Sequence, residues 1–478
     1  MMLPTSWHGD WAGLKAVVLG LGKSGFSAVD TLIELGVRVT AIAQSAKPEV
    51  LDLTEVIGGK VLIGDGPDLV DQLGFEPDFA IVSPGFAPNH AIIAKLQATG
   101  VQLLTDIDLA WRLRDKTSKI APWIVITGTN GKTTTSELTA HILRTAGFSA
   151  EACGNIGVPV LDMIRNPDGF DYLVLELSSF QLHYMGPIAP TSSAFLNFAD
   201  DHLDWHGSRE KYFAAKSKIF QGTETAVVFN EEDKSTFEAA KLAEVQEGAR
   251  GVSFTLGIPL RSMVGFVEEF LVDRAFLEER AEQALEIAEI EDLEKIGPVS
   301  SHLKQNVAAA TALTRSVGVP PAVIKRAIQS FRLAPHRVQL VGVFDGISFI
   351  DDSKATNAHA AAGSLSSFES VVWIVGGLLK GVDIGGLLEK YEGRIKAAVI
   401  IGAETTELES LFDQKLPNLP RRVLTNQPMS EVVSAAIEMA DPGDVVLLAP
   451  AAASMDQYRD YAHRGSEFQL EVRRRAGL

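Results

Sequence analysis

The sequence predicts an α/β protein of three domains, each built on a mostly parallel sheet. Short apolar runs such as KAVVLG (15–20), WIVITG (123–128) and SVVWIVGG (370–377) alternate with helical patterns along most of the 478 residues. Strands of this kind, separated by helices, are typical of parallel sheets whose two faces are both covered. The length also indicates several domains, because single hydrophobic cores rarely grow beyond about 250–300 residues.

We place the domain boundaries near residues 118 and 334. The first domain (1–118) ends at the polar stretch DKTSKIAP (115–122). The second domain (119–334) carries a glycine-rich loop, and the third (335–478) begins at Pro335-His336-Arg337. We expect the acidic stretch from 268 to 295 to form a solvated helical or hairpin face, as runs of like charge usually do.

Composition excludes several classes of partner. The formal net charge of −18 argues against nucleic acid or an anionic membrane as the main partner. A single cysteine, Cys153, allows no internal disulfide, which fits a reducing cytoplasm. The sequence MMLPTSWHGD does not resemble a signal peptide, and no segment approaches the roughly 18 apolar residues of a membrane helix. We therefore expect a cytoplasmic protein without membrane insertion.

The first domain opens with a turn that suggests a dinucleotide cofactor. Residues 20–25 (GLGKSG) follow a strand and precede a helical pattern, as in a dinucleotide-binding fingerprint. The next strand should then end in an acidic residue that holds the ribose, but it ends in Ala43, Gln44 and Ser45. We interpret the turn as an anion-binding site for another nucleotide diphosphate.

The second domain begins with a phosphate loop. The strand at 124–127 leads into GTNGKTTT (128–135), and a helix is predicted from 136 to 145. Gly128 and Gly131 would let the backbone approach phosphate oxygens, and the helix N-terminus would add its positive dipole. Lys132 supplies a cation, and the Thr133 hydroxyl suits Mg²⁺. The alternative is a tight strand-to-helix turn without a ligand.

Two further residues suggest a metal and substrate site in the second domain. Glu176 lies in the otherwise apolar strand YLVLELS (172–178), where a lone carboxylate is costly unless it is paired or bound to a metal. Mg²⁺ is the natural partner beside a phosphate loop. Asn155 lies in the loop GNIG (154–157), which could also be a plain Asn-Gly turn.

These motifs resemble the Mur ligase family, ATP-dependent enzymes that form amide bonds. The string TGTNGKTTT (127–135) carries the resemblance, and NFADDHLD (197–204) resembles the N-x-x-x-D-H-x-D motif of the family. The resemblance implies an N-terminal Rossmann-like domain that binds UDP and a central P-loop-like ATPase domain with a mostly parallel sheet. A C-terminal Rossmann-like domain would bind the amino acid.

The resemblance also implies a catalytic centre with ATP, two Mg²⁺ ions and a carbamylated lysine. The implied catalytic residues are Lys132, Glu176, His202 and Lys216. Lys216 would carry the carbamate, and the implied metal ligands are Thr133, Glu176, His202 and Lys216. The implied ATP-binding residues are Gly128, Thr129, Asn130, Gly131, Lys132, Thr133, Thr134, His302, Asn306, Arg337 and Asp352.

For the UDP-linked substrate, the resemblance implies contacts from the first two domains. The residues are Gly22, Lys23, Ser24, Ser83, Gly85, Asn155 and His202. Ala43, Gln44 and Ser45 depart from the acidic and hydroxyl or arginine residues that the family often has near that strand end. The contacts to uracil therefore stay open.

The third domain carries the strongest indication of the amino-acid substrate. The string DSKATN (352–357) resembles the branch of the family that adds D-glutamate, and GGLLKG (376–381) and APAAASMDQY (449–458) match loops of that branch. The residues implied for D-glutamate are Lys354, Thr356, Lys380, Ser454, Met455 and Tyr461. We expect a monomer that ligates D-glutamate to UDP-N-acetylmuramoyl-L-alanine through an acyl phosphate, giving ADP and phosphate, in peptidoglycan precursor synthesis.

Three alternatives remain at this point. An NAD-dependent oxidoreductase would explain GLGKSG but leaves GTNGKTTT, Glu176 and His202 without a role. A non-catalytic nucleotide-binding protein on the same fold would not need Lys132, Glu176, His202 and Lys216 together. A ligase for a different amino acid would keep the mechanism and change only the interpretation of the third domain.

Overall fold

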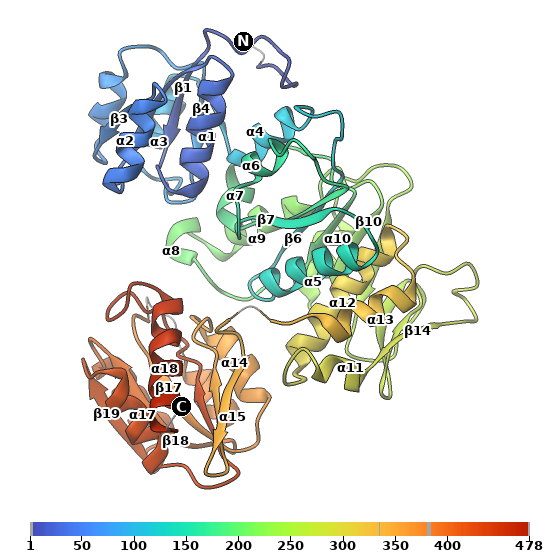
Figure 1. Ribbon diagram of the computed structural model, residues 1–478, viewed down its shortest axis with the longest axis vertical. Coiled ribbons are helices and arrows are strands. Elements are labelled where there is room, and N and C mark those ends of the chain that lie inside the picture. The colour runs from blue at the N-terminus through green and yellow to red at the C-terminus, as the bar shows by residue number, and fades with distance from the viewer. Residues whose placement is uncertain (1–2, 334, 380–383, 477–478) are drawn as a thin grey trace. The chain divides into compact units, whose positions relative to one another are not determined.

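Three separate β-sheets form in the part of the chain that the structure describes, which confirms the predicted α/β class with three sheet-based domains (Figure 1). The computed structural model describes residues 3–333, 335–379 and 384–476. Contacts divide the chain into two units, residues 1–288 with 305–327 and residues 289–304 with 328–478. The first unit holds the first sheet and most of the second, and the second unit holds the third sheet. The boundaries at 118 and 334 stay predictions.

The first sheet has five parallel strands in the order β3-β2-β1-β4-β5. Its strands are β1 (Lys15–Leu19), β2 (Arg38–Ala43), β3 (Lys60–Ile63), β4 (Phe79–Val82) and β5 (Gln102–Leu104). Its helices are α1 (Lys23–Glu34), α2 (Pro48–Val56), the 3₁₀ helix η1 (Pro67–Leu73), α3 (Ala91–Ala98) and α4 (Asp106–Leu113). The strand order reverses at β1, and ligands of such sheets bind at the carboxyl end of that point.

The central sheet has nine strands in the order β14-β13-β12-β11-β10-β9-β6-β8-β7. All neighbouring pairs from β7 across to β12 are parallel, and β12 pairs with β13 in the antiparallel direction. The strands are β6 (Trp123–Thr127), β7 (Ala150–Gly154), β8 (Tyr172–Glu176), β9 (Ser192–Phe195), β10 (Ala226–Asn230), β11 (Arg250–Phe254), β12 (Met263–Val267), β13 (Phe270–Asp273) and β14 (Leu285–Glu289).

The helices of this region are mostly short. They are α5 (Lys132–Thr145), α6 (Val160–Ile164), α7 (Ser179–Tyr184), α8 (Leu203–His206), α9 (Arg209–Ser217), η2 (Lys218–Phe220), α10 (Lys234–Lys241), α11 (Ile290–Glu294), α12 (Ser301–Ser316) and α13 (Pro321–Ser330). The acidic stretch from 268 to 295 forms β13, β14 and α11, so it contributes two strands to the edge of the sheet as well as a helix.

The third sheet has six strands in the order β15-β16-β20-β17-β18-β19, and the pair β15–β16 is antiparallel. The strands are β15 (Gln339–Phe344), β16 (Ile347–Asp351), β17 (Val371–Gly376), β18 (Ile395–Gly402), β19 (Arg421–Thr425) and β20 (Val445–Leu448). The helices are α14 (Ala358–Ser366), α15 (Gly385–Tyr391), α16 (Thr406–Lys415), α17 (Met429–Glu438) and α18 (Tyr461–Arg475). Buried side chains from both faces of this sheet form two separate apolar clusters, as expected for a sheet covered on both sides.

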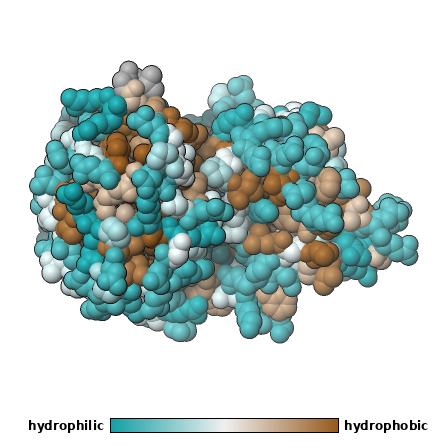
Figure 2. Space-filling model, turned by 90° about the horizontal axis from the view of Figure 1, so that it is seen from below, coloured by the Kyte–Doolittle hydropathy of each residue, from teal (hydrophilic) through white to brown (hydrophobic). Residues whose placement is uncertain are grey.

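The surface is mixed in polarity. Hydrophilic residues cover most of the face shown in Figure 2, and hydrophobic residues appear on it in separate patches. In the described part of the chain, none of the helices is both long enough and apolar enough to cross a bilayer.

Candidate active site

The phosphate loop lies at the carboxyl end of β6, between β8, which ends at Glu176, and β9, which ends at Phe195. β6 pairs with β8 so that Ile126 lies opposite Glu176, and it pairs with β9 so that Thr127 lies opposite Phe195. The loop is therefore flanked by Glu176 on one side and by Asn197, two residues beyond β9, on the other. Parallel strands bring their carboxyl ends to one edge, so residues far apart in sequence meet there.

Two glycines are required by the shape of the loop. Gly131 has a φ of 81°, and a Cβ atom at this position would lie 2.2 Å from Oδ1 of Asn306. A Cβ atom at Gly128 would lie 3.0 Å from the side chain of Leu196. α5 begins directly after the loop, at Lys132, so its unpaired N–H groups face the loop.

Asn197 holds the loop in this conformation. Its Oδ1 accepts a hydrogen bond from the backbone N–H of Asn130 at 2.8 Å, and its Nδ2 donates to the Asn130 carbonyl at 3.1 Å. Its own carbonyl accepts from the N–H of Thr129 at 3.0 Å. The motif at 197–204 includes Asn197, but this role could not be predicted, because the sequence does not reveal that β9 is the neighbour of β6.

Lys132 is folded back onto the loop. Its Nζ donates to the carbonyl oxygens of Gly128 and Thr129, both at 2.9 Å. The ammonium group therefore lies over the cradle that the sequence predicts for phosphate. Because the side chain is flexible, it can exchange these neutral acceptors for an anionic phosphate oxygen, which makes a stronger hydrogen bond.

Glu176 ends β8 as a buried carboxylate with an exposed fraction of 2%. Thr133 Oγ1 donates to its Oε2 at 2.6 Å, and Asn155 Nδ2 donates to its Oε1 at 2.9 Å. Oxygen atoms of a carboxylate and a hydroxyl are the ligands that Mg²⁺ prefers, so these two residues fit the predicted ion. Among the described residues, no three His, Cys, Asp or Glu side chains converge on one point, so these residue types alone form no complete metal site.

Lys216 is one of the largest fully buried side chains, although it is a lysine. Its Nζ donates to the Gly128 carbonyl at 2.7 Å and lies 3.4 Å from Oγ1 of Thr127. Burial lowers the pKa of Lys216 well below its usual value, and the charge of Lys132 lowers it further, while Asp201 and Glu176 oppose this. The amine is thus held at the base of the phosphate loop in surroundings that favour its neutral form.

His202 has a left-handed backbone with a φ of 52° and is the N-cap residue of α8. Its ring packs against Phe180 with centroids 4.7 Å apart, and its Nε2 lies 3.5 Å from Asp201 Oδ2. Burial lowers the pKa of His202, and the charges of Lys216 and Lys132 add to this effect. Since Lys216 also interacts electrostatically with Glu176, the structure brings the four predicted catalytic residues into one neighbourhood.

The residues predicted for UDP fall into two groups. Gly22 caps the start of α1, and Lys23 and Ser24 form its first turn. Gly20, with a φ of 92°, lies so close to Ser83 that a Cβ atom would approach the serine Cβ to 2.8 Å, so the turn and the end of β4 are in contact. Gly85 follows two residues after Ser83, and a Cβ atom there would meet open space. The second group lies at the central sheet and includes Asn155, whose amide contacts Glu176.

On α12, Asn306 and His302 lie one helical turn apart. Asn306 faces the phosphate loop, where its Oδ1 accepts from Thr135 Oγ1 at 3.4 Å. The His302 ring lies 5.2 Å from that of His359, and burial followed by the charges of His359 and Lys390 lowers the pKa of His302 to about 4. Burial thus favours a neutral imidazole at His302, and the roles of both residues in ATP binding stay predictions.

In the second unit, the loops after β16 and β20 carry most of the residues predicted for the amino acid. Ser454 is buried, Met455 is exposed, and Nζ of Lys354 lies 5.4 Å from the centre of the Tyr461 ring. The N–H of Thr356 donates to the Lys354 carbonyl at 2.9 Å. Lys380 lies outside the described residues.

Asp352, the first residue after β16, has a buried carboxyl group. Ser364 Oγ donates to its Oδ2, and the N–H of Val338 donates to its Oδ1 at 3.2 Å. Burial raises the pKa of Asp352 to about 7, although these hydrogen bonds and the charge of Arg337 lower it. Arg337 thus interacts electrostatically with Asp352, the other residue of this unit that the sequence predicts for ATP.

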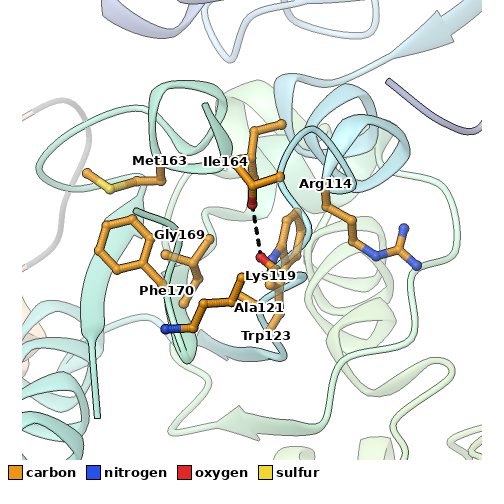
Figure 3. A pocket seen from close by; sticks show the side chains of 10 residues that line it. Arg114, Lys119, Ala121, Trp123, Met163, Ile164, Gly169 and Phe170 are labelled. Atoms are coloured by element: carbon orange, nitrogen blue, oxygen red, sulfur yellow. Dashed lines mark hydrogen bonds between the residues drawn. The ribbon is translucent and has the colours of Figure 1, made fainter. Parts of the chain in front are cut away.

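A separate small pocket lies at the amino end of β6 and contains none of the predicted site residues. Figure 3 shows the side chains that line it, among them Arg114, Trp123 and Met163. Its volume of about 10 Å³ accommodates no more than a water molecule. The pocket is therefore too small for a nucleotide, and the loop at the other end of β6 stays the candidate active site.

Comparison with known proteins now identifies the family. Models of the Mur ligase MurD-like N-terminal domain, the Mur ligase middle domain and the Mur ligase glutamate ligase domain match residues 14–105, 126–313 and 336–452. A UDP-N-acetylmuramoylalanine–D-glutamate ligase of Leifsonia xyli subsp. xyli is 47% identical over 98% of this chain and 94% of its own. The chain belongs to the Mur ligase family. This assignment decides against the oxidoreductase alternative.

Other relatives of this Mur ligase agree. A UDP-N-acetylmuramoylalanine–D-glutamate ligase of Tropheryma whipplei is 44% identical over 97% of this chain and 96% of its own. Among solved structures, a UDP-N-acetylmuramate-alanine ligase of Thermotoga maritima has a TM-score of 0.56 at 17% identity, covering 97% of this chain and 99% of its own. At 17% identity, the likeness to the Thermotoga maritima structure supports the fold alone. The identities of 47% and 44% show the relationship to the two D-glutamate ligases.

Proposed function

We propose that this Mur ligase joins D-glutamate to the alanine carboxyl group of UDP-N-acetylmuramoyl-L-alanine with the hydrolysis of ATP. The observation that carries the proposal is the identity of 47% over nearly the whole chain with a ligase of that name. DSKATN at 352–357, which resembles the D-glutamate-adding branch, supports it independently of the central domain.

The reaction consists of two displacements. An oxygen of the alanine carboxylate attacks the γ-phosphorus of ATP, so that ADP leaves and an acyl phosphate forms. The amine of D-glutamate then attacks the acyl carbon, and the tetrahedral intermediate collapses to the amide, phosphate and a proton. Phosphoryl transfer depends mainly on positioning and on stabilising charge, which is what the residues around the phosphate loop supply.

The phosphate loop and its neighbours would bind ATP. The N–H groups at the start of α5 would face the β- and γ-phosphates. Lys132, which now contacts the Gly128 and Thr129 carbonyls, would exchange them for phosphate oxygens. Bound Mg²⁺ supplies positive charge to the transferring phosphate, and Thr133 and Glu176 would hold one ion. The resemblance adds the remaining ATP contacts, His302, Asn306, Arg337 and Asp352.

Lys216 would carry a carbamate. The amine nitrogen attacks CO₂, and loss of a proton leaves an N-carboxylate anion that can bind the second Mg²⁺ together with His202. A buried ammonium group without an acidic partner is costly. Lys216 makes no ion pair within the described residues, and its amine lies on neutral oxygens instead. These surroundings favour the neutral amine that the reaction with CO₂ requires.

D-Glutamate would bind at the carboxyl edge of the third sheet. Lys354, Lys380, Thr356 and Ser454 offer cations and hydroxyl groups for its two carboxylates, and the backbone at Met455 and the Tyr461 ring complete the site. A dicarboxylic amino acid requires this combination of cations and oriented donors. The position of Lys354 beside Tyr461 supports the grouping.

Release of phosphate from ATP tests the proposal. The assay contains Mg²⁺, bicarbonate and UDP-N-acetylmuramoyl-L-alanine, and it compares D-glutamate with L-glutamate, L-alanine and meso-diaminopimelate. Turnover only with D-glutamate is the expected result. Turnover with another amino acid would keep the ligase chemistry and refute the interpretation of DSKATN, and absence of turnover with all four would refute the proposed UDP-linked substrate.

A further inference from the structure

One face of α1 is polar and docks onto α6. Ser27, Asp30, Thr31 and Glu34 follow the spacing i, i+3, i+4, i+7, which places them on one side of the helix. Their partners are two residues at or next to α6, Asp162 and Arg165, within the same unit of the molecule. The face that a helix packs against its neighbour is usually apolar, so the polar residues between α1 and α6 are unusual.

Arg165 is the centre of the contact. Its Nη1 lies 2.6 Å from Asp30 Oδ2 and donates to Thr31 Oγ1 at 3.0 Å, while its Nε lies 3.2 Å from Glu34 Oε2. Ser27 Oγ donates to Asp162 Oδ1 at 2.6 Å, one turn earlier on both helices. These bonds fix both the separation of α1 and α6 and their register along the helix axes.

Arg165 neutralises part of the acidic charge at this contact. Three carboxylates, those of Asp30, Glu34 and Asp162, surround the one guanidinium group, and Asp162 lies 3.8 Å from it. Lys116 also pairs with Glu34, at 2.5 Å. Without Arg165, Asp30 and Asp162 would repel each other across the contact. The side chains are 21–43% exposed, so solvent screens these charges and each pair contributes little to folding stability.

Both helices are connected directly to the proposed substrate contacts. α1 begins at the turn of Gly22, Lys23 and Ser24, which we assign to the diphosphate. α6 follows the loop of Asn155, whose amide holds Glu176. The α1–α6 contact therefore determines how far the diphosphate turn lies from the catalytic carboxylate, and the substrate has to span that distance.

We propose that Arg165 is a positioning residue for the UDP-linked substrate. It sets the distance between the diphosphate turn and Glu176 at the end of β8. The inference rests on the proposed function. A ligand that spans two preorganised sites binds more tightly than one that must first bring them together. Loss of Arg165 should thus weaken only a ligand long enough to contact both.

Two ligands of different length test this. We compare the wild type with Arg165→Met and Arg165→Lys, measuring the affinity for UDP by titration calorimetry and the KM for UDP-N-acetylmuramoyl-L-alanine by phosphate release. In Arg165→Met we expect a KM about tenfold higher, a UDP affinity within about twofold of the wild type, and unchanged KM values for ATP and D-glutamate. Arg165→Lys should restore part of the loss, because it keeps the charge without the forked geometry.

A second substitution separates positioning from loss of structure. Asp30→Asn in the Arg165→Met background removes the repulsion with Asp162, while Glu34 keeps Lys116 as its partner, so the KM should return towards the wild type. Arg422→Met is the matched control, because Arg422 pairs with Glu438 at 3.3 Å on the surface of the second unit. It should leave every constant unchanged.

Each other outcome overturns the inference. An unchanged KM in Arg165→Met, an equal loss of UDP affinity, or a failure of Asp30→Asn to rescue would each show that the contact does not position the substrate. If the wild type itself forms no amide with the UDP-linked substrate, the proposed function fails, and the calorimetry with UDP alone still reports whether the diphosphate turn binds.

Discussion

The hydroxyl of Thr133 donates a 2.6 Å hydrogen bond to Oε2 of Glu176. This bond joins the first turn of α5 to the last residue of β8 and connects the phosphate loop to the buried carboxylate that we assign to Mg²⁺. The bond places the hydroxyl and carboxylate oxygen atoms next to each other. Such preorganisation lowers the cost of assembling a charged site.

We expect Thr133→Val to lose most activity and Thr133→Ser to retain it. Valine has the same shape as threonine but removes the hydroxyl, and a hydrogen bond to a charged group contributes about 1.5–3 kcal/mol. The value of kcat/KM should fall about 10- to 100-fold, and the Mg²⁺ concentration for half-maximal phosphate release should rise. Equal Mg²⁺ dependence of the two variants would contradict a role of the hydroxyl at the metal.

Glu176→Gln should separate activity from stability. Glutamine keeps the volume, and it can accept from Asn155 and donate to the Thr133 hydroxyl, so both hydrogen bonds can persist. The free energy of unfolding should change by less than about 1 kcal/mol, because neutral pairs replace charged ones in a buried site. Phosphate release should fall by at least about a hundredfold if the negative charge binds Mg²⁺. Activity close to the wild type would remove Glu176 from the metal site.

Gly131→Ala should destabilise the protein more than Gly147→Ala. Both residues have a positive φ, of 81° and 93°, so each substitution carries a similar backbone cost of about 1 kcal/mol. Only at Gly131 does the new methyl group meet a neighbour, Oδ1 of Asn306 at 2.2 Å, whereas Gly147 faces open space. Chemical denaturation measures the difference, and equal effects would show that Asn306 can move away freely.

The contrast between Glu176 and Asn197 shows what the sequence could and could not predict. Glu176 was predictable, because a single carboxylate in an apolar strand is conspicuous without knowledge of the fold. Asn197 was not, since its function of holding Thr129 and Asn130 depends on β9 lying beside β6. The sequence suggests parallel strands, but it does not specify that the order is β9-β6-β8 rather than another arrangement.

The start of α5 and the partners of Arg165 could not be predicted from the sequence either. The apolar pattern predicts a helix from 136, whereas α5 begins at Lys132, because the polar residues 132–135 form its first turn directly after the left-handed Gly131. The contact of Arg165 with Asp30 joins α1 to the end of α6, and partly exposed charges on helices have no sequence pattern that reveals their partners. Resemblance to the family supplied most of the remaining site residues, and their roles stay predictions.

Lys216 should carry CO₂ in the active enzyme. We expect a carbamate resonance in the ¹³C NMR spectrum of the wild type after incubation with ¹³C-bicarbonate, and its absence in Lys216→Arg, because a guanidinium group stays protonated. Lys218→Arg is the control, because Lys218 Nζ donates to the carbonyls of His183, at 2.6 Å, and Met185, which do not belong to the phosphate loop. Lys216→Arg should also lose phosphate release, and a resonance that persists in this variant would place the carbamate elsewhere.

Asp352 should make the third sheet less stable as the pH rises. Burial raises the pKa of Asp352 from 3.8 to about 7, so the folded state binds a proton that the unfolded chain releases. The stabilising contribution of the protonated form is complete below pH 3.8 and is lost as the pH rises to about 7. At 1.36 kcal/mol per pKa unit, the loss amounts to about 4 kcal/mol.

Hydrogen exchange of peptides from β16 and β20 measures this stability, with Asp352→Asn compared at each pH so that intrinsic exchange rates cancel. The ratio of wild-type to Asp352→Asn protection should fall between pH 5 and pH 8, whereas a constant ratio would show that the carboxyl group is ionised throughout.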